Sequence, residues 1–241
     1  GAVETAVTDR HKLAELMVGA EVKPPVVRAS KPGPALMRLN GVSTPAQGNT
    51  PGLDHADLEL RAGQIVGIAG VSGNGQAALA GLLAGTERPS DGDMDIHGLH
   101  PQDWSPRTAM AAGIARIPED RHKTGSIADF TLTENAILEG FDKPPFARGG
   151  WMSWRAARDF AANVILKYDV RCPGPETRIR LLSGGNMQKL ILGRALETKP
   201  QVILANQPVR GLVIGAITFV HGQLLAARDR GAAVLLISED L

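Results

Sequence analysis

The sequence predicts an α/β fold in which helices cover both faces of a mostly parallel sheet. Short apolar runs of strand length alternate with longer segments of helical composition, which is the pattern of repeated βα units. One run, Ile65–Ala69, is apolar throughout, as expected for a strand that is buried on both faces. The chain has 241 residues, of which 43% are hydrophobic and 21% charged, so it can form a substantial core.

The expected elements follow one another in a regular order. Two segments of alternating polarity come first, Ala35–Leu39 and Ala56–Leu60, and are expected to form antiparallel strands. The apolar strand Ile65–Ala69 then leads through a glycine-rich turn into a helix, Gln76–Leu83. The later elements are the strands Ile114–Ile117, Val202–Ala205 and Ala232–Ile237 and the helices Gly184–Glu197 and Ile214–Arg230.

Two regions depart from the βα pattern. Residues 1–33 contain Lys-Pro-Pro and Lys-Pro-Gly-Pro breaks and are predicted to be a linker from a preceding domain, with one short helix at Thr8–Met17. Residues 127–180 hold two predicted helices, Thr131–Leu138 and about Ser153–Tyr168, and no strand pattern. We therefore expect one domain over 34–241 with a helical subdomain inserted at about 127–180.

The composition argues against several classes of protein. The formal net charge is +1 and the basic residues are dispersed, so the electrostatic signature of a nucleic-acid-binding protein is missing. Cys172 is the single cysteine, which rules out an internal disulfide and fits a reducing compartment. No apolar run approaches the roughly 18 residues of a membrane-spanning helix. The first residues also lack the basic start and apolar stretch of a signal peptide.

The turn after Ile65–Ala69 has the glycine spacing of a phosphate-binding P-loop. Glycines at a helix N-terminus let successive backbone N–H groups approach an anion. The two side chains that complete such a loop are missing, because Gln76 replaces the lysine and Ala77 replaces the magnesium-binding hydroxyl. The change to Gln76 forfeits roughly 1–2 kcal/mol. A tight strand-to-helix turn is the alternative. The candidate residues are Gly70, Ser72, Gly73, Asn74, Gly75, Gln76 and Ala77.

A second glycine-rich segment, Leu182–Lys189, precedes another predicted helix. Ser183 can cap that helix, and Gly184 and Gly185 leave room for a phosphate beside the backbone N–H groups. A helix cap without a ligand is the alternative interpretation of these residues.

The two segments, with a helical insert between them and an apolar strand after them, resemble the ABC ATPases over about residues 35–241. Four segments look like the second, C-terminal nucleotide-binding half of importers for simple sugars and nucleosides. Leu13–Gly19 looks like the end of the first half, and the usual C-terminal portion is expected to be missing after Leu241. The four segments are GVSGNGQ (70–76), IPEDR (117–121), LSGGNMQK (182–189) and PVRGL (208–212).

This resemblance implies a P-loop NTPase-like ABC core with ATP as its cofactor. The implied partners are the first nucleotide-binding half of the same polypeptide and transmembrane permease subunits. The implied location is the cytoplasmic face of the plasma membrane. The groove around Glu119–Gly125 and the helical insert would receive a short helix of the permease, although a solvated charged loop is the alternative for these residues.

The resemblance also identifies positions at which a working ATPase site has lost its chemistry. The Walker B aspartate and the catalytic glutamate correspond to Asn206 and Gln207, and amides neither accept a proton from water nor bind magnesium well. Glu119 stands at the Q-loop glutamine, a candidate nucleotide contact, and Glu239 at the switch histidine. No metal ligands are therefore expected here, and Mg²⁺ is expected at the partner's site.

Two further positions differ from a working half. Val213 replaces the D-loop aspartate, and the adenine-stacking aromatic is missing near Pro45–Ala46. We expect this half to be inactive or weak alone, and its intact signature, Ser183 to Gly185, to complete the ATP site of the partner half. Gln207 and Glu239 favour the nucleoside branch over the sugar branch. The alternatives are a soluble ABC ATPase outside transport, a scaffold half that binds no nucleotide, and a dinucleotide-binding fold.

Overall fold

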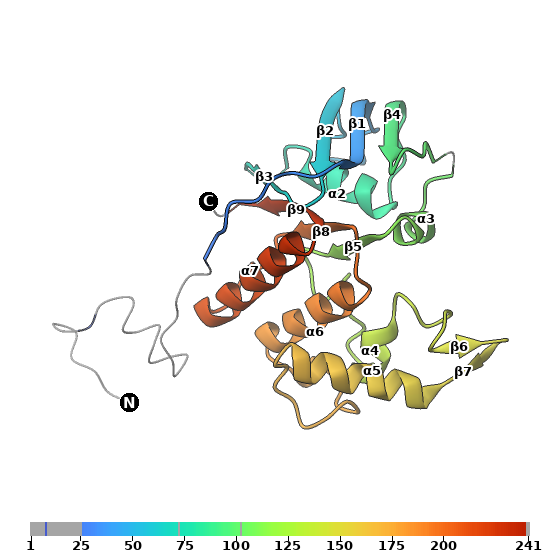
Figure 1. Ribbon diagram of the computed structural model, residues 1–241, viewed down its shortest axis with the longest axis vertical. Helices are drawn as coiled ribbons and strands as arrows, with labels where there is room; N and C mark the ends of the chain where they lie inside the picture. Colours follow the sequence, from blue (N-terminus) through green and yellow to red (C-terminus); the bar gives the residue numbers. More distant parts are fainter. Residues whose placement is uncertain (1–7, 9–25, 72, 102, 240–241) are drawn as a thin grey trace.

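The computed structural model describes residue 8 and residues 26–71, 73–101 and 103–239. In this part of the chain, an antiparallel sheet lies above a parallel sheet, and a group of helices lies below both (Figure 1). The α/β fold, the mostly parallel core sheet, the antiparallel strands and the helical portion predicted from the sequence are all confirmed.

The antiparallel sheet has the strand order β2-β1-β4. Leu39 of the central strand lies opposite Leu58 on one side and Met94 on the other. The third strand was not predicted, because its sequence DGDMDI contains only Met94 and Ile96 as apolar residues. Both are buried, so the alternation is present but short. The strands are β1 (Ala35–Ser43), β2 (Ala56–Arg61) and β4 (Asp91–Ile96).

The parallel sheet has the strand order β3-β9-β8-β5 and forms the centre of the molecule. Its side chains alternate between two separate cores, as the period of two requires. Val202 and Leu204 join the core on one face, whereas Ile203 and Ala205 join the core on the other. The strands are β3 (Ile65–Ala69), β5 (Ile114–Ile117), β8 (Val202–Asn206) and β9 (Ala233–Ser238).

The prediction that Ile65–Ala69 is buried on both faces is wrong. In the described chain β3 is an edge strand that pairs only with β9, and Gly67 and Ala69 are exposed. An apolar composition shows that a segment suits a strand, but the position of that strand in the sheet depends on segments far away in the sequence.

One helix lies between the two sheets and two cover the opposite face of the parallel sheet. Helix α2 (Gln76–Ala84) places Leu82 and Leu83 in a core shared with Leu39 and Leu235. Helices α6 (Gly184–Glu197) and α7 (Ile214–Asp229) pack on the other face (Figure 1). Helix α3 (Pro106–Ala111) was not predicted, although Ser105 and Thr108 form a capping box at its start.

The insert is helical, as predicted, but it also contains strands. Its helices are α4 (Leu132–Ile137) and α5 (Trp154–Lys167), which are capped by Thr131 and Ser153. The expectation that 127–180 holds no strand is wrong, because β6 (Ala147–Arg148) and β7 (Trp151–Met152) form a small hairpin. Each strand has two residues, which is too short to produce a periodic pattern in the sequence. A 3₁₀ turn, Ile179–Leu181, leads to α6.

The predicted linker is described only at Thr8 and over 26–33. Ser30 donates a hydrogen bond to the Gly63 carbonyl at 2.7 Å, and Gly33 N–H donates to the Ala62 carbonyl at 2.8 Å. Apart from Thr8, the predicted helix Thr8–Met17 lies outside the described residues. Among the described helices, none has both the length and the apolar character needed to cross a membrane.

Candidate functional site

The order of the parallel strands brings most of the candidate residues to one edge of the sheet. Parallel strands all end at the same edge, which is where ligands bind in open α/β sheets. Here β3 ends at the glycine loop, β9 leads to Glu239, β8 ends at Asn206 and β5 leads to Glu119. Positions that are far apart in the sequence therefore form a row along the carboxyl edge.

The glycine loop between β3 and α2 has the backbone of an anion-binding turn. Gly73 and Gly75 have φ angles of +91° and +90°, in the left-handed region that favours glycine, and Gly75 is the N-cap of α2. Apart from the residues next to Gly73 in the chain, no atom of the described residues lies within 4 Å of the position that a Cβ at Gly73 would occupy. Ser72 lies outside the described residues.

The side chain of Gln76 folds back onto this loop and bonds to it twice. Its Nε2 donates to the Val71 carbonyl at 3.0 Å, and its Oε1 accepts from the Asn74 N–H at 2.9 Å. A lysine at this position could make the first bond but not the second, because an ammonium group has no acceptor. Gln76 therefore occupies a loop N–H that a phosphate oxygen could otherwise use. The next residue, Ala77, is exposed and has no polar side-chain atom.

Gln207 joins the ends of β8 and β9. It adopts a left-handed φ of +48° and is only 8% exposed. Its backbone N–H donates to the Ile237 carbonyl at 2.9 Å, and its side-chain Oε1 accepts from the Glu239 N–H at 3.3 Å. The structure thus brings Gln207 and Glu239 together. The side-chain amide of Gln207 makes a structural bond here and cannot act as a base.

The loop after β5 is tied to the turn after β8. Glu119 forms an ion pair with Arg210, and Arg121 Nη1 donates to the Arg210 carbonyl at 2.8 Å. The N–H groups of Lys123 and His122 hold the pKa of the Asp120 carboxyl below its ordinary value, because both donate to its Oδ1 at 2.9 Å. Asp120 and Arg121 are half-buried, whereas Glu119, Lys123 and Arg210 are exposed, so the alternative of a solvated charged loop still fits Glu119.

The signature segment begins α6, and its serine is exposed. Ser183 is the N-cap, and its Oγ accepts from Asn186 Nδ2 at 3.1 Å and from the Asn186 N–H at 3.5 Å. The capping role is therefore confirmed. Gly184 lies against the guanidinium of Arg121, and Gly185 lies against Ala216.

The glycine loop and the signature segment lie on opposite faces of the parallel sheet. Helix α2 joins the core that faces the antiparallel sheet, whereas α6 joins the core that faces the insert. Figure 1 shows the two helices separated by the strands. A single chain therefore does not bring Gly75 and Ser183 together.

The sequence interpretation missed two buried polar residues of α6. Gln188 is 2% exposed and donates to the Pro208 carbonyl at 2.8 Å. Arg194 is 5% exposed and donates to the carbonyls of Asn135 and Gly125, both at 3.0 Å. Burial lowers the pKa of Arg194, and the nearby Glu139 opposes that shift. Gln188 lies between Met187 and Lys189, and Arg194 lies between Gly193 and Ala195, and no spacing rule distinguishes either from a solvated polar face.

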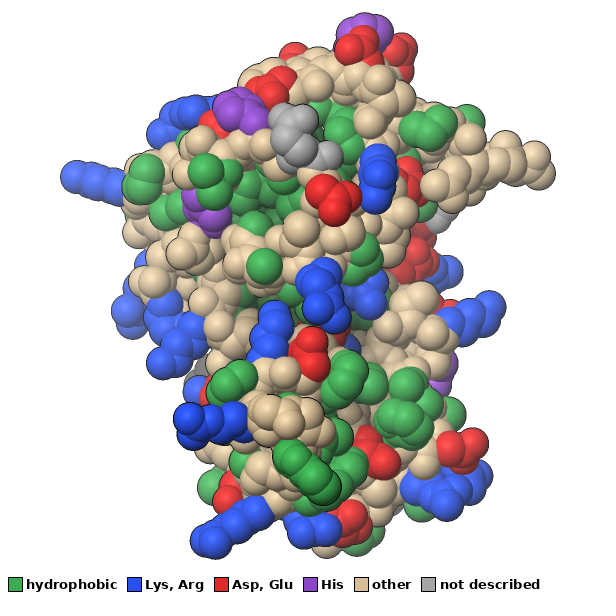
Figure 2. Space-filling view, turned by 90° about the vertical axis from the view of Figure 1, so that its right-hand side faces the viewer, with side chains coloured by type: hydrophobic (Ala, Val, Ile, Leu, Met, Phe, Trp, Pro, Cys, Tyr) green, Lys and Arg blue, Asp and Glu red, His purple; other side chains and the backbone are tan. Residues whose placement is uncertain are grey.

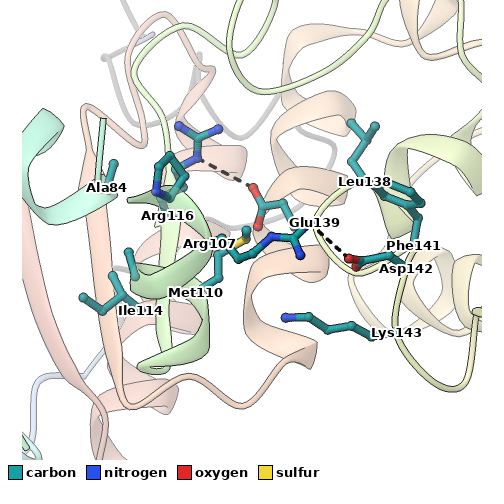
Figure 3. Close-up of a pocket in the computed structure, with 12 residues that line it drawn as sticks. Ala84, Arg107, Met110, Ile114, Arg116, Leu138, Glu139, Phe141, Asp142 and Lys143 are labelled. Carbon is teal, nitrogen blue, oxygen red and sulfur yellow. Dashed lines mark hydrogen bonds and ion pairs between the residues drawn. The ribbon is translucent and has the colours of Figure 1, made fainter. Parts of the chain in front are cut away.

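A cavity of about 160 Å³ lies between the core and the insert (Figure 3). Arg107 of α3 and Arg116 of β5 face it from the core, and Glu139 and Asp142 face it from the insert. Two ion pairs cross this seam, Arg116–Glu139 at 3.7 Å and Arg107–Asp142 at 3.5 Å. Residues Glu119–Gly125, where the permease groove was predicted, do not line this cavity. Figure 2 shows Lys and Arg side chains gathered at mid-height on this side of the molecule, with hydrophobic side chains exposed below them.

No cluster of three or more His, Cys, Asp or Glu side chains that could hold a metal ion occurs among the described residues. Asn206, which stands at the metal-binding position of the resemblance, is half-buried at the end of β8. An amide oxygen at this point is a weaker cation ligand than a carboxylate.

Two solved structures share this fold. The ATP-binding cassette MJ0796 bound to ADP and Pi aligns with a TM-score of 0.71 and 22% identity over 85% of this chain and 88% of that chain. A nucleotide-free ATP-binding cassette from an ABC transporter aligns with a TM-score of 0.68 and 20% identity over 86% of this chain and 83% of that chain. Both confirm the cassette fold.

Sequence comparison gives longer and closer matches. Guanosine import ATP-binding protein NupO of Bacillus subtilis is 40% identical over 235 residues, which are 97% of this chain and 46% of that protein. Glucose import ATP-binding protein TsgD13 of Haloferax volcanii is 39% identical over an alignment of 244 positions, which covers 100% of this chain and 44% of that protein. The chain thus spans less than half the length of these relatives. A family model described as ABC transporter matches residues 53–210, so the chain belongs to the ABC transporter family.

Proposed function

We propose that this chain is the second, C-terminal nucleotide-binding domain of an ATP-driven importer, and that its signature segment completes the ATP site of the first half. The proposal rests on the contrast between the signature segment and the residues at the carboxyl edge of the parallel sheet. Ser183 is exposed at the start of a long helix beside two glycines, whereas the row at the carboxyl edge holds Asn206, Gln207 and Glu239 in place of a metal ligand, a base and a histidine.

The signature segment has the features that a phosphate-contacting element needs. The first N–H groups of a helix have no partner within the helix and point along its axis toward an approaching anion. Gly184 and Gly185 carry no side chain that could block that approach. We propose that Ser183 and these glycines contact the γ-phosphate of ATP held by the P-loop of the first half, where Mg²⁺ also binds.

The chain's own site supports little or no hydrolysis in this proposal. Gln76 occupies the Asn74 N–H, and Ala77 offers no oxygen to a cation. Gln207 uses its amide to hold Glu239 and cannot activate water. Catalysis in the assembly is therefore assigned to the partner half, with this half supplying donors that stabilise charge in the transition state.

We propose nucleosides or simple sugars as the solutes, and nucleosides in preference. Gln207 and Glu239 favour the nucleoside branch. Relatives named for nucleosides include NupO and the nucleoside import ATP-binding protein NupA of Lactococcus lactis, which is 33% identical over 99% of this chain and 47% of its own length. TsgD13, named for glucose, is nearly as similar as NupO. Uptake assays with guanosine, glucose and ribose would distinguish these solutes.

We propose that the other partners are permease subunits, which hold the domain at the cytoplasmic face of the plasma membrane. The seam between the core and the insert supports this assignment. It is hollow beside the ion pairs Arg116–Glu139 and Arg107–Asp142, and Phe141 on its rim is 52% exposed. A short helix of the permease could dock along it or in the groove next to Glu119–Gly125.

The test is the substitution Ser183→Arg in the complete two-domain protein assembled with its permease. A bulky cation at the helix start blocks the approach to the γ-phosphate and removes the hydroxyl. We expect the steady-state ATPase rate to fall by a factor of about 100 to 1000, which is the range for losing one donor to a transition state.

Ser153→Arg is the matched control. Ser153 is also an exposed N-cap, and α5 has 14 residues, as α6 does. We expect this control to keep the ATPase rate within about twofold of wild type. An ATPase rate for Ser183→Arg equal to that of Ser153→Arg would rule out the proposed role of the signature.

A further inference from the structure

Three segments of the carboxyl edge meet at the side chain of Arg121. The residue itself belongs to the loop after β5. Its Nη1 donates to the Arg210 carbonyl at 2.8 Å, in the turn after β8. Its guanidinium also lies against Gly184, the first residue of α6. One side chain thus joins two loops of the core to the start of the signature helix.

Two glycines make room for this guanidinium. A Cβ at Gly184 would lie 3.1 Å from Nη2 and 3.2 Å from Nε of Arg121. A Cβ at Gly211 would lie 3.6 Å from Nη2, and Gly211 has a left-handed φ of +66°. The Arg121 side chain therefore fills the space between the signature segment and the turn after β8.

Buried bonds beneath Arg121 join the same elements. Gln188 of α6 donates to the Pro208 carbonyl at 2.8 Å. Ser126 Oγ lies 2.7 Å from the Arg121 carbonyl and 3.7 Å from the sulfur of Met187 in α6. Arg121 is the half-buried, outer member of this set, nearest to the exposed Ser183.

Glu119, two residues before Arg121, forms an ion pair with Arg210. Both side chains of this pair are exposed, so it contributes little to holding the carbonyl that accepts from Arg121. A cation beside the N-terminus of a helix is electrostatically unfavourable, so Arg121 is not placed there by the field of α6. The bond to Arg210 and the fit between Gly184 and Gly211 hold it in place.

We infer that Arg121 is a positioning residue, which clamps the signature segment to the turn after β8 so that the two move as one unit. The consequence for catalysis rests on the proposed function, because it concerns how Ser183 to Gly185 are presented to a nucleotide on the partner half. Arg121 acts through Gly184 and the Arg210 carbonyl and touches no substrate itself.

Arg121→Met is a clean test of the clamp. Methionine keeps most of the aliphatic length but cannot donate to the Arg210 carbonyl. The Nε of Arg121 is buried and has no partner among the described residues, so the substitution also removes an unsatisfied donor. We therefore expect the melting temperature to stay close to wild type.

The primary measurement is hydrogen–deuterium exchange on this chain alone. In Arg121→Met we expect the peptides that cover Leu182–Gly185 and Arg210–Leu212 to exchange about fivefold faster, as for the loss of one hydrogen bond. Exchange in β1 should stay unchanged. Arg121→Lys, which can still donate to the Arg210 carbonyl, should restore slow exchange. Arg158→Met is the matched control, since Arg158 pairs with Glu176 on the exposed side of the insert.

A second measurement connects the clamp to catalysis. In the complete assembly we expect Arg121→Met to lower the kcat for ATP about tenfold, through misplacement of the signature, while the KM stays within about twofold. The melting temperature, measured on the same sample, distinguishes this result from loss of folded protein.

Different results overturn the clamp by Arg121 and the proposed function of the signature segment. Unchanged exchange at Leu182–Gly185 in Arg121→Met overturns the clamp, whatever the ATPase rate. Faster exchange that Arg121→Lys restores supports the clamp. If the ATPase rate is then unchanged in both Arg121→Met and Ser183→Arg, the clamp stands and the proposed function is overturned.

Discussion

The glycine loop and the signature segment have a similar construction. Each is a glycine-rich turn that begins a helix at the carboxyl edge of the parallel sheet, α2 in one case and α6 in the other. Bonds from the half-buried Gln76 close the glycine loop onto itself. Gln188 bonds the signature segment to the turn after β8, and the serine of the segment stays exposed.

In the proposed function, the two turns differ in the side chains that they offer to a phosphate. Gly73 and Gly75 preserve the backbone of an anion site, but Gln76 uses one N–H and Ala77 supplies no ligand. The signature segment keeps its backbone and its serine. In the proposal, side chains alone distinguish the two turns, since both keep their glycines.

The largest effect is expected where the anchor of α6 is broken. Arg194→Met leaves the carbonyls of Asn135 and Gly125 without their buried donor, and it removes the 3.5 Å ion pair between Arg194 and the half-buried Glu139. We expect the free energy of unfolding to fall by about 3 kcal/mol. Urea denaturation measured by circular dichroism gives this value directly.

Arg158→Met provides the comparison, because its ion pair with Glu176 is exposed. Its cost should stay within about 0.5 kcal/mol. Equal losses in the two variants would show that the buried bonds of Arg194 do not anchor α6.

The next effect concerns the glycine loop. The double variant Gln76→Lys, Ala77→Ser removes the acceptor that holds the Asn74 N–H and adds a cation and a hydroxyl. We expect the affinity of this chain for Mg-ATP to rise about tenfold, since charge-assisted bonds to phosphate are roughly twice as strong as neutral ones. Isothermal titration calorimetry measures the change.

Gln201→Lys controls for the added positive charge, because Gln201 is exposed just before β8, at the opposite edge of the sheet. This control should bind ATP as the wild type does. If the double variant bound no better than this control, Gln76 would not be what closes the loop.

The smallest effect is expected on α7, which covers the same face of the sheet as α6. Burial lowers the pKa of His221 below its ordinary value. The unfolded chain therefore binds a proton at a higher pH than the folded chain, so stability is full above about pH 6.5 and falls as the pH drops toward the folded pKa. Because His221 is partly solvated, we expect a loss below about 1 kcal/mol. Denaturation at pH 7.5 and pH 5.5 should differ less in His221→Gln than in wild type, and an unchanged difference would contradict the assignment.

Most elements could be predicted from local patterns, and each failure has a specific physical cause. The strand Ile114–Ile117 and the helix Gly184–Glu197 were predicted with the bounds that the structure gives. Strand β4 was missed because acidic residues surround Met94 and Ile96. The β6–β7 hairpin was missed because two-residue strands carry no period. The exposure of β3 was missed because its place in the sheet is not a local property.

The candidate site also contains residues that local patterns predict and residues that they do not. The glycines and Ser183 could be found from the sequence, because the backbone geometry of an anion site requires these residue types at this spacing. The roles of Arg121 and Gln188 could not, because each depends on a carbonyl in the turn after β8, far along the chain.

Residue type and short-range spacing predict the α/β class, the glycine turns and the cap at Ser183. The place of β3 at an edge, the bonds of Gln76 to its own loop and the contact of Arg121 with the signature appear only in the folded chain. Hydrogen bonds and burial depend on which distant segments the sheet order brings together, and no local period encodes that order.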